Sequence, residues 1–104
     1  MKLYHFTRRE NVLNMYKEGI RPGSFWCRSI EDCRLFLGLY MKVGLIPSPC
    51  DIAYVSIDFE EDEVIESDDH NRAFIDCDAF FCPERIDKSR IPKLYDIPLF
   101  TTSI

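Results

Sequence analysis

The sequence has few glycines, no CxxC pair and no long apolar run. Four glycines in 104 residues exclude a collagen-like chain, and the balance of apolar and charged residues excludes a coiled coil or a disordered chain. The most apolar stretch, residues 35–41, is far shorter than the ~20 apolar residues that a membrane-spanning helix requires. The first ten residues contain no apolar signal core that would indicate export. We therefore expect one cytoplasmic domain covering residues 1–104.

The five cysteines are an odd number, and their spacing fits neither a disulfide framework nor a metal site. An odd count without a CxxC pair favours reduced thiols in a cytosol. The gaps between Cys27 and Cys33 and between Cys77 and Cys82 are poor matches to a zinc knuckle. We expect no metal, and we expect the cysteines to pack as small core hydrophobes.

Charge is distributed unevenly along this chain of net charge −5. Residues 1–42 carry a net +4, residues 43–104 carry a net −9, and eight of the twelve residues 58–69 are acidic. An acidic protein is a poor duplex binder, because duplex binding needs several cations on one face. Adjacent carboxylates are costly to bury, so we expect a solvent-exposed negative patch that faces a basic protein partner. Its expected members are Glu60, Glu61, Asp62, Glu63, Glu66, Asp68 and Asp69.

Helical periodicity is confined to the first half of the sequence. A capping box is expected at the first helix, with the Thr7 hydroxyl accepting from the amide of Glu10, and Ser29 is the expected N-cap of the second. The predicted elements are strands over residues 2–6 and 24–27 and helices over residues 8–18 and 30–42. The expected inward side chains are Val12, Leu13, Tyr16 and Ile20 in the first helix and Cys33, Phe36, Leu37, Tyr40 and Met41 in the second.

Strand patterns dominate the second half. Residues 52–59 alternate, which is typical of an antiparallel strand buried on one face. Further strands are predicted at residues 64–65 and within 73–82, and the proline-containing tail is expected as an edge strand or an extended wrap. Helices that precede strands indicate an α+β fold rather than a doubly wound one.

Six short segments form an ordered series along the chain: an opening His-x-Thr strand, an Asn on the first helix, a Gly-Ile pair at its end and three later strands. They are residues 3–7, Asn11, residues 19–20, 25–29, 54–58 and 80–86. This series resembles the ADP-ribosyltransferase superfamily, most closely its small bacterial toxins and phage-type transferases. The resemblance implies a split, strongly bent, antiparallel-rich sheet with two N-terminal helices packed on it.

The resemblance also implies mono-ADP-ribosyl transfer from NAD. This reaction breaks the bond between nicotinamide and ribose through an oxocarbenium-like centre, as glycoside cleavage does. It needs an anchor for the ribose, an aromatic face for nicotinamide and a carboxylate where positive charge develops. The expected acceptor is a protein, less readily a nucleic acid, in a toxin or a phage counter-defence factor. The alternative is a catalytically decayed, acidic binding protein that inhibits a basic, nucleic-acid-binding partner.

The resemblance assigns roles to particular residues. For NAD binding it implies His5 at the ribose, Thr7 at the strand edge, Trp26 in the cleft, Phe36 or Tyr40 against nicotinamide, and Arg8, Arg28 or Arg34 at the pyrophosphate. For catalysis it implies Asp78, which occupies the strand position where most relatives carry the catalytic Glu. Glu84 is the other candidate. Structural roles stay open beside these: His5 as a core-edge histidine, Thr7 as a cap, and Trp26, Phe36 and Tyr40 as core.

Overall fold

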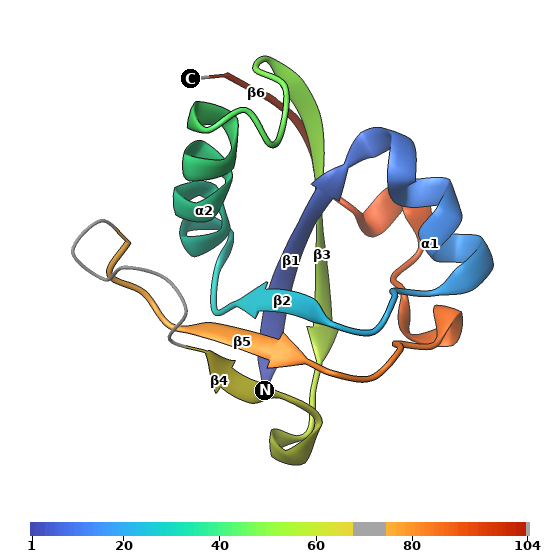
Figure 1. Ribbon diagram of the computed structural model, residues 1–104. Helices are drawn as coiled ribbons and strands as arrows, with labels where there is room; N and C mark the ends of the chain where they lie inside the picture. Colours follow the sequence, from blue (N-terminus) through green and yellow to red (C-terminus); the bar gives the residue numbers. More distant parts are fainter. Residues whose placement is uncertain (68–74, 104) are drawn as a thin grey trace.

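A computed structural model describes residues 1–67 and 75–103 of the chain. Within these residues the protein has an α+β fold with two α-helices, as the sequence predicted, and its strands form one antiparallel sheet of six (Figure 1). The strand order across the sheet is β4-β5-β2-β1-β3-β6. The strands are β1 (Lys2–Arg8), β2 (Ser24–Cys27), β3 (Cys50–Asp58), β4 (Ile65–Ser67), β5 (Ala79–Cys82) and β6 (Leu99–Thr102), and the helices are α1 (Val12–Glu18) and α2 (Ile30–Lys42).

The sheet divides between β1 and β2. β1 pairs with β3 along its whole length, from Lys2 opposite Asp58 to Arg8 opposite Ile52. β1 and β2, in contrast, share one residue pair, Tyr4 with Cys27. As a result β2, β5 and β4 cross the direction of β1 and β3 instead of continuing alongside them (Figure 1). The bend at this junction opens the space in which the candidate site lies.

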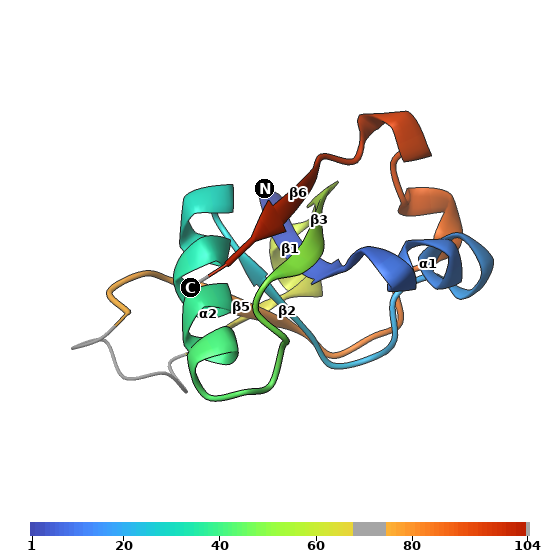
Figure 2. The same ribbon diagram turned by 90° about the horizontal axis from the view of Figure 1, so that it is seen from above.

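The two helices cover opposite faces of the sheet (Figure 2). On the α1 side, the buried cluster contains Leu3, Trp26 and Val55, together with residues of α1 and β5. On the α2 side, Leu37 and Tyr54 belong to a second buried cluster. Burial of this apolar area is the main stabilising contribution, at about 25 cal/mol per Å². Each face of the bent sheet therefore has its own core.

The first helix differs from its prediction at its start. β1 continues to Arg8, and a 3₁₀ turn, η1 (Arg9–Asn11), precedes α1. Thr7 does not form the expected capping box: it pairs with Ala53 in the sheet, and its hydroxyl accepts from Nδ2 of Asn11 at 3.5 Å. The later start shifts the buried face of the helix. Val12 and Met15 are buried, Tyr16 is half-buried and Leu13 is 63% exposed, which corrects the expected inward position of Leu13.

The second helix confirms its prediction in both bounds and phase. Ser29 is its N-cap, and its hydroxyl accepts from the amide of Asp32 at 3.1 Å. Cys33, Leu37 and Met41 are buried on the inward stripe, and Phe36 and Tyr40 are half-buried beside them. No helix in the described part of the chain has the length and apolar character needed to cross a bilayer.

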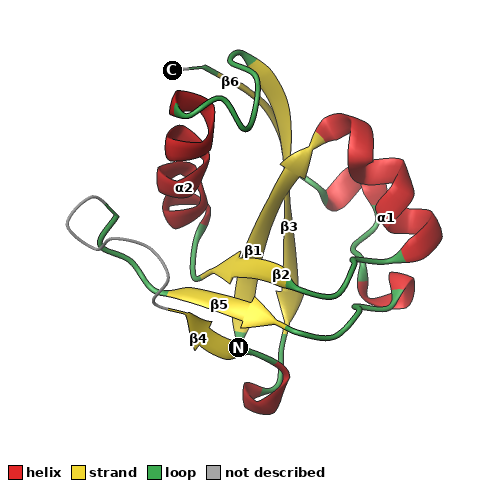
Figure 3. Ribbon diagram, viewed as in Figure 1, coloured by secondary structure: helices red, strands yellow, loops and turns green. Residues whose placement is uncertain are grey.

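β3 is more deeply buried than its alternation predicted. Ala53 and Val55 enter the core on the α1 side, whereas Ile52 and Tyr54 enter the core beneath α2. The prediction of one buried face was wrong because α2 covers the face that was expected to meet solvent. In the described part of the chain, four 3₁₀ turns, coloured as helices in Figure 3, lie in the connections: η1, η2 (Glu61–Glu63), η3 (Lys88–Arg90) and η4 (Leu94–Asp96).

Candidate dinucleotide-binding site

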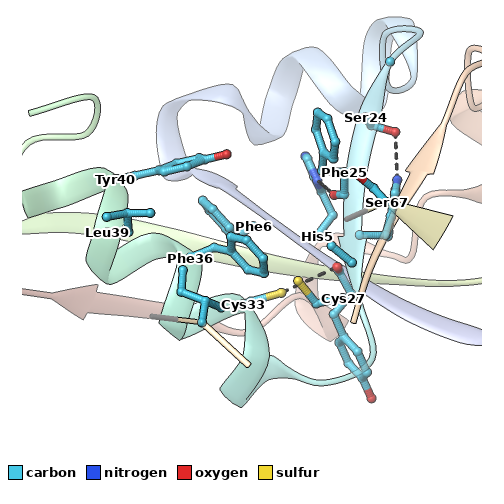
Figure 4. Close-up of a pocket in the computed structure, with 15 residues that line it drawn as sticks. His5, Phe6, Ser24, Phe25, Cys27, Cys33, Phe36, Leu39, Tyr40 and Ser67 are labelled. Atoms are coloured by element: carbon cyan, nitrogen blue, oxygen red, sulfur yellow. Dashed lines mark hydrogen bonds between the residues drawn. The ribbon is translucent and has the colours of Figure 1, made fainter. Parts of the chain in front are cut away.

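An aromatic cavity of about 580 Å³ lies where the sheet splits, between the β1–β2 junction and α2 (Figure 4). Aromatic rings supply much of its wall: His5 and Phe6 come from β1, Phe25 from β2, and Phe36 and Tyr40 from α2. The described residues that line it also include Tyr4, Gly23, Ser24, Trp26, Cys27, Cys33, Leu39, Ser67, Ile75 and Ala79. Such a wall suits a flat aromatic ring with a few polar substituents.

His5 occupies the gap between the two parts of the sheet. Its Nδ1 lies 2.7 Å from the carbonyl oxygen of Phe25, so the side chain bridges β1 and β2 where the backbone ladder is missing. A carbonyl only accepts, so Nδ1 carries the proton and Nε2 of the neutral ring keeps a lone pair. Burial lowers the pKa of His5, which favours this neutral form, although the Phe25 carbonyl raises the pKa in part.

The indole of Trp26 supports His5 from the core. The two ring centroids are 5.0 Å apart, and Trp26 is completely buried. Indole Nε1 donates to the hydroxyl of Ser24 at 2.7 Å, which satisfies its only donor. Trp26 also meets Phe59 edge-on, with centroids 4.8 Å apart. The His5 ring is therefore held on two sides, by a carbonyl and by a fixed aromatic plane.

A second, polar cavity of about 640 Å³ adjoins the first. The two share His5, Gly23 and Ser24 in their walls. The polar cavity lies between the end of β1, α1 and the turn that leads into β2, and Arg21 is the one cation among its described lining residues. Its other polar side chains are Thr7, Asn11, Asn14 and Glu18. Together, the two cavities offer an aromatic compartment and a hydrogen-bonding compartment that meet at His5.

The structure brings together five of the residues implied for NAD binding and separates the three arginines from them. Among the implied residues, the aromatic cavity is lined by His5, Trp26, Phe36 and Tyr40, and the polar cavity by His5 and Thr7. The arginines face other regions.

Each arginine has another contact. Arg8 lines a different hollow and pairs with Glu10 at 2.9 Å, and Arg34 lies over the ring of Phe100. The guanidinium of Arg28 lies over the Phe80 ring, with 4.8 Å to its centroid. Arg21, which the sequence reasoning missed, is the cation that the fold brings to the polar cavity.

The two candidate catalytic carboxylates are outside the described walls of both cavities. Asp78 lies just before β5, and its Oδ2 accepts from Nε of Arg28 at 3.0 Å. The next residue, Ala79, is the one that lines the aromatic cavity. Glu84 is exposed beyond β5. Of the described residues around the aromatic cavity, none is Asp or Glu.

The acidic residues after β3 are divided between solvent and a structural ion pair. Glu60, Glu61, Asp62 and Glu66 are exposed, as expected for a negative patch. Glu63 departs from that expectation because it is half-buried and its carboxylate accepts two hydrogen bonds from Arg90, one of them 3.1 Å long. This pairing lowers the pKa of Glu63. Asp68 and Asp69 lie outside the described residues.

Sequence reasoning also missed Ser24 and Phe25, which both line the aromatic cavity. Alternation in the short strand over residues 24–27 could have placed Ser24 on the same face as Trp26, but it gave no signal for Phe25, which points to the other face. Trp26 was assigned to the cleft, but its neighbours were not considered.

The chain matches no protein-family model, no curated protein and no solved structure.

Proposed function

We propose that this protein binds NAD across the two adjoining cavities and acts as a mono-ADP-ribosyltransferase on a protein target. The observation that carries the proposal is the meeting of an aromatic and a polar compartment at His5. NAD has the same division, with a flat nicotinamide ring at one end and an adenosine with ribose hydroxyls at the other. The ordered series of motifs that resembles ADP-ribosyltransferases supports the choice of this dinucleotide.

The nicotinamide, the ribose hydroxyls and the pyrophosphate of NAD have chemically matched environments. Nicotinamide stacks in the aromatic cavity against Phe36 or Tyr40 on α2. The lone pair of His5 Nε2 accepts from a ribose hydroxyl, and Thr7 and Asn11 supply further polar contacts for the adenosine ribose. Arg21 offers its planar fork to the pyrophosphate. The lowered pKa of His5 matters here, because a protonated ring would lose this acceptor.

The transfer step exchanges one bond at C1′ of the nicotinamide ribose. The bond from C1′ to nicotinamide breaks, and nicotinamide leaves with the electron pair. An acceptor nucleophile on the target protein bonds to C1′ and releases its proton to a base. A carboxylate close to C1′ stabilises the oxocarbenium-like transition state. Asp78 and Glu84 remain the candidates for this role, and Asp78 would have to leave Arg28 to reach the cavity.

The test is a nicotinamide-release assay with NAD labelled in the nicotinamide ring, run with and without histones as basic acceptor proteins. We expect release by the natural protein and loss of release in Asp78→Asn, whereas Glu84→Gln tests the second candidate carboxylate. Both side chains are at least partly exposed, so neither variant empties the core. An absence of both NAD binding and nicotinamide release would overturn the proposal.

A second candidate function is binding of a basic protein without transfer. Two observations favour it: Asp78 is paired with Arg28 outside the aromatic cavity, and four acidic residues after β3 are exposed. Capture of the protein on immobilised histones should then fall steeply as salt rises, because exposed charges are screened. The triple change Glu60→Lys, Glu61→Lys and Asp62→Lys should abolish capture at low salt. Unaltered capture by this variant would contradict the second function.

A further inference from the structure

Two of the five cysteines face each other in the wall of the aromatic cavity. Cys27 ends β2 and Cys33 lies in the first turns of α2. Both line the cavity and belong to the same buried cluster, and their side chains are neighbours in its wall (Figure 4). Cys33 Sγ also donates to the backbone oxygen of Tyr4 at 3.5 Å. The sulfur atoms are thus oriented by the same β1–β2 junction that positions His5.

From this arrangement we infer that Cys27 and Cys33 form a reversible disulfide in the wall of the cavity. The inference is independent of NAD binding. The pair joins β2 to α2 across the five residues 28–32, so little chain has to move for the two sulfur atoms to meet. Of the other three cysteines, Cys50 is half-buried beyond α2, and Cys82 donates to the carbonyl of Glu84 at the far end of β5. Cys77 is buried just before β5 and close enough to influence Cys33, so it is the competing partner.

The surroundings of the two thiols decide which of them attacks the oxidant first. The hydrogen bond from Cys33 lowers the pKa of Cys27, whereas the same contact and burial raise the pKa of Cys33. Cys27 therefore supplies the attacking thiolate, and Cys33 resolves the product. Both thiols are buried, Cys33 fully and Cys27 with 5% exposed, so Cys27 is the more accessible of the two, and the cavity that both line is the route of approach.

The oxidant is a small-molecule disulfide such as glutathione disulfide. The Cys27 thiolate attacks one sulfur atom, breaking the reagent's S–S bond and releasing one small thiolate that takes up a proton. Cys33 then loses its proton and attacks Cys27 Sγ, which displaces the second small thiol. In total, two protein thiols are oxidised to one disulfide and one small disulfide is reduced to two thiols.

The experiment treats the full chain with glutathione disulfide, blocks the remaining thiols with N-ethylmaleimide and maps the tryptic peptides by mass spectrometry. Arg28 and Arg34 allow trypsin to separate the two cysteines. We expect a linked pair of peptides containing Cys27 and Cys33 as the main oxidised product, and its disappearance after dithiothreitol. In Cys33→Ser, Cys27 should instead keep one glutathione, and Cys82→Ser is the matched control that should still form the linked pair.

The inference is overturned if Cys27 and Cys33 are both labelled by N-ethylmaleimide after oxidation, or if either is linked mainly to another cysteine. Because the natural protein alone gives this result, the test does not depend on folding of the serine variants. A final arm adds NAD before the oxidant. Slower oxidation would support occupancy of the cavity by NAD, whereas an unchanged rate would count against the proposed function and leave the disulfide intact as an inference.

Discussion

His5 links the split of the sheet to the pH dependence of stability. Burial holds its folded-state pKa below the ordinary value of 6.5, so the unfolded chain binds more protons as pH falls below about 6.5. Stability that is fully present above this pH is therefore lost as pH falls toward the folded pKa. We predict that the free energy of unfolding, measured with urea, falls more between pH 7.5 and pH 5.5 in the natural protein than in His5→Gln.

The matched control for this prediction is His70→Gln, which removes the other histidine of the chain. Carboxylates with lowered pKa values, such as Glu63, change the stability only below this pH range. The stabilisation that they provide is lost as pH falls beneath the ordinary pKa of a carboxyl group. A pH dependence that survives in His5→Gln but disappears in His70→Gln would show that His5 has no such role.

Gly19 has a conformation and a contact that another residue cannot reproduce. Its φ is +77°, and a Cβ there would lie 2.1 Å from the carbonyl oxygen of Ile86. This carbonyl accepts from the amide of Ile20, which ties the end of α1 to the segment after β5. We predict that Gly19→Ala lowers the free energy of unfolding by about 3 kcal/mol or more, because strain and the backbone clash add.

Gly44 provides the control, since its φ is +82° but no atom lies within 4 Å of a Cβ built there. Gly44→Ala should cost only the strain of the left-handed conformation, about 1 kcal/mol. Chemical denaturation of both variants measures the difference. Equal losses of unfolding free energy in the two variants would mean that the clash between a Cβ at position 19 and the carbonyl oxygen of Ile86 adds nothing to the cost.

At the level of elements, η2 and η3 are joined by a charged pair. Arg90 donates to both carboxylate oxygens of Glu63 and also to the carbonyl oxygen of Asp58 at 2.7 Å. Glu63 additionally accepts from the amide of Glu60. We predict that Glu63→Gln lowers the free energy of unfolding by about 1–2 kcal/mol, because hydrogen bonds to charged groups are lost.

The neighbouring Glu61→Gln is the control for this prediction, since Glu61 is exposed and should change stability by no more than about 0.5 kcal/mol. Thermal unfolding at neutral pH compares the two variants. Equal melting temperatures would mean that the acidic stretch is uniform and that Glu63 belongs to the solvent-facing patch after all.

Elements with strong local signals were predictable from the sequence, and those decided by distant contacts were not. α2 was placed correctly because Ser29 caps it and its apolar stripe is regular. The start of α1 was misplaced because Thr7, a good local cap, instead extends the ladder with β3, which lies far along the chain. Pairing of β2 with both β1 and β5 leaves no trace in local periodicity, so the strand order had to come from the structure.

The same distinction applies to the candidate site. His5, Trp26, Phe36 and Tyr40 were proposed from short motifs, and the fold gathers them around one cavity. The phosphate-binding arginines could not be chosen from sequence, because several arginines occur in the first half and only tertiary structure brings Arg21 to the polar cavity. Asp78 was chosen by register, but the residue that reaches the aromatic cavity is its neighbour Ala79.

At the scale of the whole molecule, the proposed function requires one ligand to span both cavities. Titration calorimetry with NAD tests this directly, using Tyr40→Ala for the aromatic cavity, Arg21→Gln for the polar cavity and Lys93→Gln as an exposed control outside both. We predict one NAD per chain, unchanged affinity in Lys93→Gln and about tenfold weaker binding in each of the other two variants, which corresponds to about 1.4 kcal/mol. No binding to the natural protein, or binding that neither cavity variant weakens, would contradict the account.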